Sequence, residues 1–405
     1  MLLVKIAFRN IFRHKRRTLL TLISMAGGYA LMSISFAIIE GSYSRLIDAF
    51  TKSYVGHVQI HKQGFLDKPS VYLTIPEYDK AVETLNSSAE VKSWAPRVIF
   101  SSLAYGNQKT MGVQAVGIDP DKEKNTTRIE ASVKKGKYLQ PEFSKEILVG
   151  YGIAKVLKLK LGDAIVLMGQ AADGSIANDE FFVRGIMGDE TDTRNKHKIY
   201  MELQAAQEYL ALEKRIHEVA VVIDDFRRSQ SFADQLQNSL SIQKLTVSPW
   251  EEVESGFYKA MQIDKKGNNV TLFIVMFVVG VSILNTVLMN IFERTKEFGV
   301  MIAIGTRPQS LSKIIFLEVS FLSFISVLCG VGVAYAANYY FATHGILFEE
   351  GFEYGGVVFD RMIASLDFFV FAFPAVLTWL VAVLVSFIPA YRLRKLSPIE
   401  ALREF

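Results

Sequence analysis

Cysteine is almost absent from this sequence: its 405 residues include a single one, Cys329, inside an apolar stretch. No disulfide can form within the chain, so a domain outside the membrane would be held together by core packing alone. The sequence also lacks the G-x-x-x-x-G-K-[ST] phosphate loop, H-E-x-x-H, C-x-x-C and G-x-S-x-G. We therefore predict that this chain has no catalytic residue, no metal and no cofactor of its own.

Charged residues are scarce in four long apolar stretches, each of which reaches the roughly 20 residues that a helix needs to cross a bilayer. The net charge is only +4, and the basic residues gather beside these stretches. This pattern argues against nucleic-acid binding and for a membrane protein whose basic residues set its orientation. The first stretch is too long for a signal peptide and lacks a small-x-small cleavage site. We predict transmembrane helices at 18–40, 269–292, 313–341 and 368–391.

The segments between the apolar stretches differ in charge. Basic residues are concentrated in 1–17, 293–312 and 392–405, whereas 342–367 carries mainly acidic residues. By the positive-inside rule we expect the first three segments, and hence both termini, in the cytoplasm. Residues 1–17 fit either an amphipathic helix on the inner membrane surface or a charge cluster that only sets the topology. Residues 41–268 would then form a large extracytoplasmic (periplasmic) domain, and 342–367 a short loop on the same side.

Residues 41–268 alternate short runs rich in Val, Ile and Phe with helical stretches. This alternation predicts an α+β domain, inserted between the first and second helices of a four-helix transmembrane bundle. Trp250–Lys266 also has a helical pattern and continues into the second membrane helix, so we expect a stiff connection there. Strands are expected at Gly56–His61, Met111–Ile118, Ile147–Gly150, Ala164–Met168, Phe181–Ile186 and Glu218–Ile223, and helices at Pro76–Leu85, Ile153–Leu157, Glu202–Leu212 and Phe226–Ser239.

Two groups of side chains are candidates for a metal site, and neither has convincing spacing. His57 and His61 share one face of a predicted strand, but they are too far apart along it to bind one ion. We expect these histidines at the surface or in an interface. The second group lies in a polar stretch that we interpret as a solvated loop, and it consists of Asp189, Glu190, Asp192 and His197.

The segment 293–312 has features of a docking surface. On one continuous helix Glu293 and Glu297 would share a face, beside the apolar pair Phe298 and Ile302, with Gly305 at the end. An acidic pair next to an apolar ridge suits a partner in the cytosol, although a helix that rests on lipid would show a similar pattern.

Polar residues within the membrane stretches are few and mostly uncharged. Glu318, near the inner end of the third stretch, is the charged exception. An ion or proton pathway would need titratable groups deeper in the membrane, so we expect neither a channel nor a secondary transporter. Small residues four apart, Ser24 with Gly28 and Ser326 with Gly330, allow close helix contact within one subunit or between two.

Several short motifs of this sequence resemble those of one family of membrane proteins. The sequence ERTKEFG at 293–299, followed by AIG at 303–305, resembles the E-R-x-x-E-[IF]-G…[AR]-x-G coupling segment of the FtsX/MacB-type ABC transporter permeases. Pro389–Arg392 and Pro398–Arg403 resemble the P-A-x-x-A…P-x-E-A-L-R ending of that family, with Leu393 where alanine is usual. ILVG at 147–150 with LGD at 161–163 is similar to part of its external domain, and Gly56–His61 to the opening strand of its lipoprotein-releasing (Lol-type, LolC/LolE-like) branch.

The resemblance implies an arrangement as well as a fold. Such permeases work as pairs of identical or sister chains in the inner (cytoplasmic) membrane, with two copies of a cytoplasmic ABC ATPase that bind ATP and Mg. MacB-type members carry the ATPase before their first membrane helix; here that helix begins near residue 19, so we expect an ATPase from another gene product. The coupling residues implied by the motif are Glu293, Arg294, Glu297, Phe298, Gly299, Ile302 and Gly305.

Three functions fit the resemblance. The first is ATP-driven mechanotransmission that extracts lipoproteins or lipids from the inner membrane, with membrane lipid and a periplasmic carrier as partners. The second is MacB-like efflux of periplasmic small molecules or peptides through an adaptor and an outer-membrane duct. The third is FtsX-like regulation of a cell-wall hydrolase without transport. For the first we expect a cargo path between the first two membrane helices, lined by Ser24, Gly28, Ala30, Phe36, Met276, Gly280 and Leu284.

Overall fold

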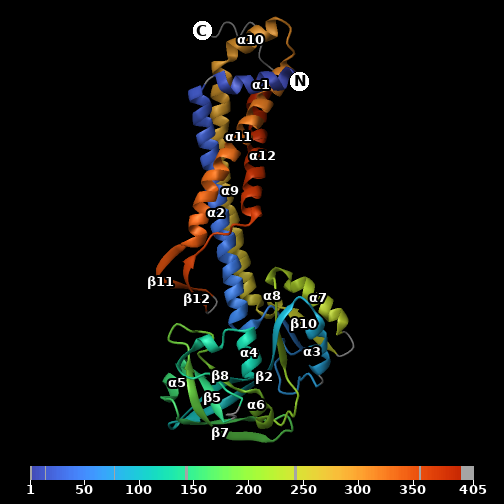
Figure 1. The fold of residues 1–405 in the computed structure, drawn as a ribbon, viewed down its shortest axis with the longest axis vertical. Coiled ribbons are helices and arrows are strands. Elements are labelled where there is room, and N and C mark those ends of the chain that lie inside the picture. The colour runs from blue at the N-terminus through green and yellow to red at the C-terminus, as the bar shows by residue number, and fades with distance from the viewer. Residues whose placement is uncertain are drawn as a thin grey trace. The chain divides into compact units, whose positions relative to one another are not determined.

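The computed structural model describes residues 2–13, 15–76, 78–141, 145–240, 244–354 and 357–393. The chain divides into two compact units, which we call the helical unit and the sheet unit. The sheet unit comprises Arg45–Met261 and Gly351–Phe359, and the helical unit comprises the residues before, between and after these two ranges. Figure 1 labels many of the helices and strands of both units.

The helical unit contains four helices that are long and apolar enough to cross a membrane, as the sequence predicts. Each of them includes one of the predicted apolar stretches. The first helix is followed directly by the π-helical turn η1 (Thr51–Val55). The four are α2 (Lys15–Phe50), α9 (Ser255–Glu293), α11 (Pro308–Thr343) and α12 (Phe368–Leu393).

A short helix, α1 (Leu2–Arg13), precedes them and packs on α11. Its residues Ala7 and Ile11 are buried, and Phe8 meets Phe321 edge-on with 6.2 Å between ring centroids. Lys5 and Arg9 are exposed. The residues at the beginning of the chain therefore form an amphipathic helix, and α11 covers part of its apolar side.

A proline inside α12 explains one contact between the long helices. Pro374 has no N–H to donate to the carbonyl of Val370, one helical turn earlier. The buried hydroxyl of Ser33 on α2 donates to that carbonyl oxygen instead, at 3.0 Å. In a membrane helix such a freed carbonyl must find a partner within the protein. Asn338 on α11 in turn donates to Ser33 Oγ at 3.4 Å, so this polar contact joins three helices.

The sheet unit is built on a ten-stranded mixed sheet with the order β10-β1-β9-β2-β3-β8-β5-β7-β4, while β6 pairs with β2 and β7. Most pairs are antiparallel, but β3 with β8 and β5 with β7 are parallel. The strands are β1 (Val58–Lys62), β2 (Val91–Gly106), β3 (Lys109–Ile118), β4 (Val133–Gly136), β5 (Glu146–Gly150), β6 (Ala164–Gln170), β7 (Ile176–Met187), β8 (Lys198–Glu202), β9 (Glu218–Ile223) and β10 (Leu245–Pro249). The helices are α3 (Tyr78–Ser87), α4 (Pro120–Thr126), α5 (Tyr151–Leu157), α6 (Leu203–Tyr209), α7 (Ser229–Ser239) and α8 (Trp250–Val253), with short turns of 3-10 helix at Glu130–Ser132 and Phe226–Arg228.

Each strand and helix predicted in this region overlaps one in the structure, so the α+β class is confirmed. The prediction missed β2, β4, β8 and β10. It also treated 342–367 as a loop, where β11 (Ile346–Tyr354) pairs with β12 (Val357–Met362). The predicted helical stretch from Trp250 is broken once, at Glu254, and α9 is then continuous past Gly267.

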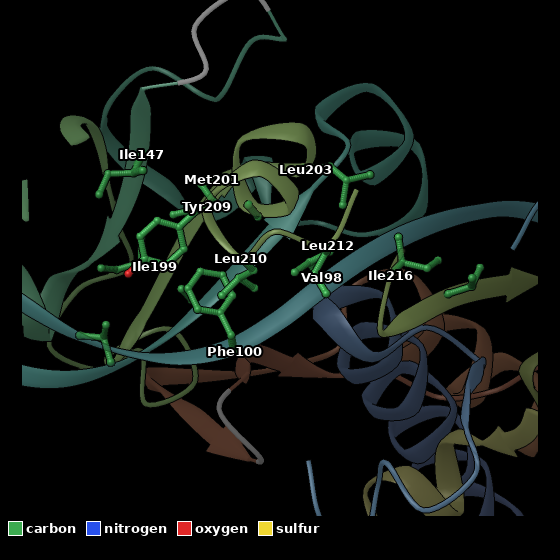
Figure 2. Packing of buried hydrophobic residues seen from close by; sticks show 14 of the residues in the cluster. Val98, Phe100, Ile147, Ile199, Met201, Leu203, Tyr209, Leu210, Leu212 and Ile216 are labelled. Atoms are coloured by element: carbon green, nitrogen blue, oxygen red, sulfur yellow. The ribbon is translucent and has the colours of Figure 1, made fainter. Parts of the chain in front are cut away.

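The main core of the sheet unit lies between the sheet and the helices α3, α5, α6 and α7, and Figure 2 shows the part of it around α6. Tyr209, at the end of α6, lies among Phe100, Ile199 and Leu210 in Figure 2. Its ring centroid is 5.5 Å from that of Phe100, and its hydroxyl donates to the carbonyl of Ala177 at 3.2 Å. The buried polar end of this tyrosine is therefore satisfied while its ring fills the core.

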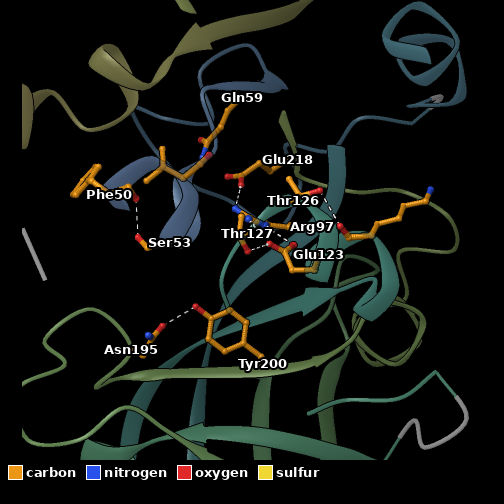
Figure 3. Close-up of polar contacts among 12 residues, drawn as sticks. Phe50, Ser53, Gln59, Arg97, Glu123, Thr126, Thr127, Asn195, Tyr200 and Glu218 are labelled. Atoms are coloured by element: carbon orange, nitrogen blue, oxygen red, sulfur yellow. Dashed lines mark hydrogen bonds and ion pairs between the residues drawn. The ribbon is translucent and has the colours of Figure 1, made fainter. Parts of the chain in front are cut away.

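A buried ionic cluster lies near β2 and β9 (Figure 3). Arg97 donates through Nε and Nη2 to the two oxygens of Glu123, at 3.0 and 2.6 Å, and through Nη1 to Glu218 Oε1 at 2.7 Å. The Arg97 and Glu123 side chains are wholly buried. Burial alone would raise the pKa of Glu218, but Arg97 and His61 hold it below its usual value. We call Arg97, Glu123 and Glu218 the Arg97 cluster.

The expectation for His57 and His61 is wrong, because both are buried. Strand β1 lies between β9 and β10, and Phe65 stacks on the His61 ring with 5.4 Å between centroids. His61 Nε2 lies 3.2 Å from Glu218 Oε2. His57 Nδ1 lies 3.0 Å from the carbonyl oxygen and 3.2 Å from the backbone nitrogen of Ile223, and burial lowers the pKa of His57 to about 4.

Candidate functional site

The helical unit reverses direction between α9 and α11 through a short helix, α10 (Thr295–Ala303). Arg294 separates α9 from α10, with backbone angles φ −108° and ψ 13° that interrupt the helix. After α10, Gly305 adopts a φ of +96°, which a residue with a Cβ would rarely take. Pro308 opens α11 at a position where no N–H is needed. The predicted docking segment is therefore a break, a helix and a turn.

Arg294 is buried at this break and is held by two glutamates. Its Nη1 donates to both carboxylate oxygens of Glu318 on α11, each at 3.0 Å, and its Nε donates to Glu297 Oε2 at 3.2 Å. Glu318 Oε1 also accepts a hydrogen bond from Asn10 Nδ2 on α1 at 2.6 Å. Only 7% of Arg294 and 5% of Glu318 is exposed. The pattern of the sequence marked Arg294 and noted Glu318, but it did not pair them.

Three of the predicted coupling residues hold α10 in place. Phe298 is 1% exposed and packs in an apolar cluster with Ala7 of α1 and Ile314 of α11. Gly299 is also buried, and Ile302 is half-buried against the same cluster. The expected apolar ridge at the surface is therefore wrong, because Phe298 faces the protein interior. Glu293 and Glu297 do not lie on one helix either, since α9 ends at Glu293.

The exposed side of this segment carries a different set of residues, which we call the α10 surface. Val300 is 50% exposed and Ile304 is 77% exposed, so this side of the segment presents apolar side chains. Charged groups of both signs accompany them. The α10 surface consists of Glu293, Lys296, Val300, Ala303, Ile304 and Gly305. It combines an apolar centre with a charged rim, as protein interfaces commonly do.

The residues predicted along a cargo path do not form a single face. Gly28 does face α9, because a Cβ there would lie 2.6 Å from Val279 Cγ2. Ala30, however, is buried with Ala334 of α11, and Phe36 packs on Phe373 of α12 with 5.3 Å between ring centroids. Ser24 is exposed. The expected passage past Ala30 and Phe36 between α2 and α9 is therefore corrected, since both side chains pack elsewhere.

The predicted residues of α9 lie together in an apolar groove between α9 and α12. Met276, Gly280 and Leu284 line it from α9, and Val381 and Val385 line it from α12. The remaining lining residues are Phe273, Phe277, Val281 and Ile388. A groove with this lining suits a hydrocarbon chain and offers no group for recognising a polar ligand.

The acidic stretch after β7 is an exposed loop, as interpreted from the sequence. Glu190 accepts hydrogen bonds from Lys155 Nζ at 2.6 Å and from the Tyr151 hydroxyl at 3.2 Å. Asp192 accepts from the backbone N–H groups of Arg194 and Asn195. Within the described residues no group of three or more His, Cys, Asp or Glu side chains is arranged to hold a metal ion.

Part of the sequence resemblance falls outside the described residues. The motif residues Pro398–Arg403, with the rest of 394–405, are not described by the structure. The α10 segment and the helix that includes Pro389–Arg392 are described. The motifs of the external domain, at 56–61, 147–150 and 161–163, are described as well.

Two protein-family models match this chain. The model of the FtsX-like permease C-terminal region matches residues 269–398. The model of the MacB-like periplasmic core domain matches residues 18–239, which is more than half of the chain. The two matches divide the chain much as the helical and sheet units do, except that the second includes α2.

Curated relatives match over almost the whole of this chain. The macrolide export ATP-binding/permease protein MacB of Vibrio parahaemolyticus is 23% identical, over 98% of this chain and 59% of the relative's own length. The lipoprotein-releasing system transmembrane protein LolE of Haemophilus influenzae is 22% identical, over 94% of this chain and 92% of LolE. The lipoprotein-releasing system transmembrane protein LolC of Neisseria meningitidis serogroup B is 19% identical, over 95% of this chain and 94% of LolC. This chain thus spans about three-fifths of the MacB relative but nearly all of each Lol relative.

Proposed function

Because this chain belongs to the FtsX/MacB-type permeases of ABC transporters, near the lipoprotein-releasing branch, we propose that it transmits ATP hydrolysis by a separate ATPase to its sheet unit. In this proposal two permease chains, identical or sister, bind two ATPase subunits on the cytoplasmic side. The ATPase holds the ATP and Mg. The work extracts a lipoprotein or another lipid from the inner membrane, and a periplasmic carrier receives it.

The groove between α9 and α12 is the observation that carries this proposal. Its lining is apolar throughout, and it includes Met276, Gly280 and Leu284. A transporter of ions or polar solutes would need polar or charged groups at such a place. An acyl chain needs only apolar contact, which this lining supplies.

The α10 surface supports the role of the ATPase. Val300 and Ile304 are exposed, while Phe298 and Arg294 are buried and hold α10 against the rest of the helical unit. A short helix that is rigidly seated and exposes apolar side chains is suited to docking a partner subunit. In this proposal the ATPase covers Ile304 and Val300 and pushes α10 when ATP binds.

MacB-like efflux with an adaptor is a second candidate, and the match of residues 18–239 to the MacB-like periplasmic core domain favours it. In that case the sheet unit would bind the adaptor, and the groove between α9 and α12 would face bulk lipid. The two candidates differ in what the purified chain carries with it.

A variant pair tests the extraction proposal. Leu284 lines the groove, whereas Val278 lies on the same helix, is 58% exposed and does not line it. We expect native mass spectrometry of the complex with its co-purified ATPase to show a bound acylated protein or a stoichiometric lipid. Leu284→Trp should abolish that species because the indole fills the groove, and Val278→Trp should retain it. A complex without lipid that holds an external protein would favour efflux instead.

A further inference from the structure

Glu318 is an ionisable residue buried in a helix that otherwise consists mainly of apolar side chains. A carboxylate in such a place is costly unless it is paired and hydrogen-bonded. The proposed groove and the α10 surface do not use this side chain. Its position therefore needs a separate explanation.

The contacts of Glu318 connect three helices. On one side its Oε1 accepts from Asn10 Nδ2 of α1 at 2.6 Å. On the other side both of its oxygens accept from Arg294 Nη1 at 3.0 Å, and Arg294 is the residue that separates α9 from α10. Arg294 in turn donates to Glu297 in the first turn of α10. One carboxylate on α11 thus contacts both α1 and the start of α10.

We propose that Glu318 is a positioning residue, which sets the angle at which α10 leaves α9 and passes displacement of α10 to α11 and α1. The source of that displacement rests on the proposed function. The positioning itself does not, because it concerns contacts within this chain.

The backbone at Arg294 explains why an ion pair is needed for this task. A continuous helix would fix the direction of α10 through its own hydrogen bonds, but the helix is interrupted at Arg294. Apolar contacts such as those of Phe298 hold α10 against α11 without strongly fixing its orientation. A guanidinium donates along directions set by its plane, so its bonds to Glu318 and Glu297 restrict the angle.

The energetics of buried ion pairs also favour a positioning role for Glu318. Replacing a buried ion pair by apolar residues of similar size is often neutral or stabilising, so such a pair is weak evidence for stability alone. The pair is therefore better explained by the geometry that its bonds impose on α10 than by its contribution to stability.

The test measures the position of α10 in the isolated chain, without any ATPase. Spin labels are placed at Lys5 on α1 and Lys296 on α10, both exposed, in a Cys329→Ser background in lipid nanodiscs. Pulsed electron resonance should give one narrow distance distribution. Glu318→Ala should broaden it at least twofold, and Glu318→Gln, which can still accept from Asn10, should broaden it less.

Two further variants separate positioning from stability. Ser323 lies on the same helix, is wholly buried and has no hydrogen-bond partner for its hydroxyl, so Ser323→Ala should leave the distribution unchanged. The double variant R294M/E318M should recover the thermal midpoint lost in Glu318→Ala while the distribution stays broad. A narrow distribution in Glu318→Ala or in R294M/E318M would overturn the positioning role.

A second measurement uses the complex with its co-purified ATPase. Glu318→Ala should keep ATP hydrolysis within about twofold of the unmodified complex while cargo release falls about tenfold or more. Equal loss of hydrolysis and release would overturn the transmission part of the inference. If the chain binds no ATPase at all, the proposed function fails, and the resonance result still decides the role of Glu318.

Discussion

Arg97 in the sheet unit and Arg294 in the helical unit are both buried and both paired with two glutamates, but their backbones differ. Arg97 lies inside β2, where β9 and β3 are hydrogen-bonded on either side and Glu218 stands directly opposite on β9. Arg294 lies at an interruption between two helices. In the first case the backbone already fixes the geometry, and the ion pairs only satisfy buried charge.

The difference between the two backbones determines how each cluster responds to a substitution. A variant can strengthen or weaken the ion pairs of the Arg97 cluster, but it does not shift the cluster, because the hydrogen bonds among β2, β3 and β9 fix the backbone there. The Arg294 pair fixes an angle that the backbone leaves open, so a change there alters the position of α10 before it unfolds anything. We therefore expect variants at Arg97 to change stability and variants at Arg294 and Glu318 to change geometry.

The largest effect is expected at Arg97. Arg97→Met leaves Glu123 and Glu218 buried without a cation and should lower the free energy of unfolding of the sheet unit by about 3–5 kcal/mol. Hydrogen exchange of β2 and β9 in the full chain would measure it. Arg128→Met is the control, since Arg128 is 57% exposed and lies 3.7 Å from Asp48; it should cost less than about 1 kcal/mol. Similar protection in the two variants would show that the buried ion pairs of Arg97 stabilise the sheet unit no more than the exposed pair of Arg128.

Acid should weaken the sheet unit selectively. Burial lowers the pKa of His57 to about 4 in the folded chain, against about 6.5 when it is unfolded. Above pH 6.5 the histidine is neutral in both states and contributes nothing. As the pH falls from 6.5 toward 4, only the unfolded state gains the proton, so the free energy of unfolding decreases by up to about 3 kcal/mol.

The measurement is the difference in the free energy of unfolding between pH 7.5 and pH 4.5, made on the unmodified chain and on His57→Gln. The glutamine amide can still hydrogen-bond to the backbone of Ile223. The variant should lose most of the pH dependence attributed to His57. His197→Gln, at an exposed position, should retain it. A pH dependence that survives in His57→Gln would assign the effect to other groups.

A smaller effect distinguishes two neighbouring glycines of α2. A Cβ on Gly28 would lie 2.6 Å from Val279 Cγ2, whereas one on Gly27 would meet nothing within 4 Å. Gly28→Ala should therefore overpack the contact with α9 and destabilise the helical unit by about 1–3 kcal/mol. Gly27→Ala should be neutral or stabilising by up to about 1 kcal/mol, because alanine favours helix. Thermal unfolding in nanodiscs compares them, and equal midpoints would show that α2 and α9 are less closely packed.

The sequence predicted the elements whose pattern is local. The apolar stretches of α2, α9, α11 and α12 are visible because a membrane helix needs many consecutive apolar residues. Strand β2 was missed because Pro96 and the polar residues around it interrupt the apolar pattern. The burial of His61 was missed for another reason: in β1 polar and apolar residues alternate as in a half-exposed strand. The ring that covers His61 belongs to Phe65, just beyond the end of the strand, and Phe65 stacks in turn on His217.

The candidate site was also predicted only as far as its pattern is local. The motif at 293–305 located the α10 segment, but treating it as one helix placed Phe298 and Ile302 on the outside and Glu293 beside Glu297. The interruption at Arg294 rotates these residues relative to that expectation, and the Arg294 side chain pairs there with Glu318, which is 24 positions away in sequence. A contact of that kind has no periodic signal, so only the three-dimensional structure reveals it.

The smallest expected effect concerns the outer side of α10. Glu297→Lys would weaken docking of the proposed ATPase, but it would also remove the acceptor of Arg294 Nε and so disturb the angle. Ile304 separates the two effects, because it is 77% exposed and holds nothing in place. Ile304→Ser should raise the dissociation constant of the ATPase about fivefold, or about 1 kcal/mol, through lost apolar burial.

The matched control is Ile263→Ser, at a position that is 70% exposed near the other end of α9. Binding of the purified ATPase to nanodisc-embedded chain would measure both variants, together with the Lys5–Lys296 distance distribution. Weaker binding by Ile304→Ser with an unchanged distribution would mean that docking and positioning depend on different residues of this segment. Unchanged binding would place the ATPase elsewhere, and the Arg294 pair would then hold α10 for a different partner.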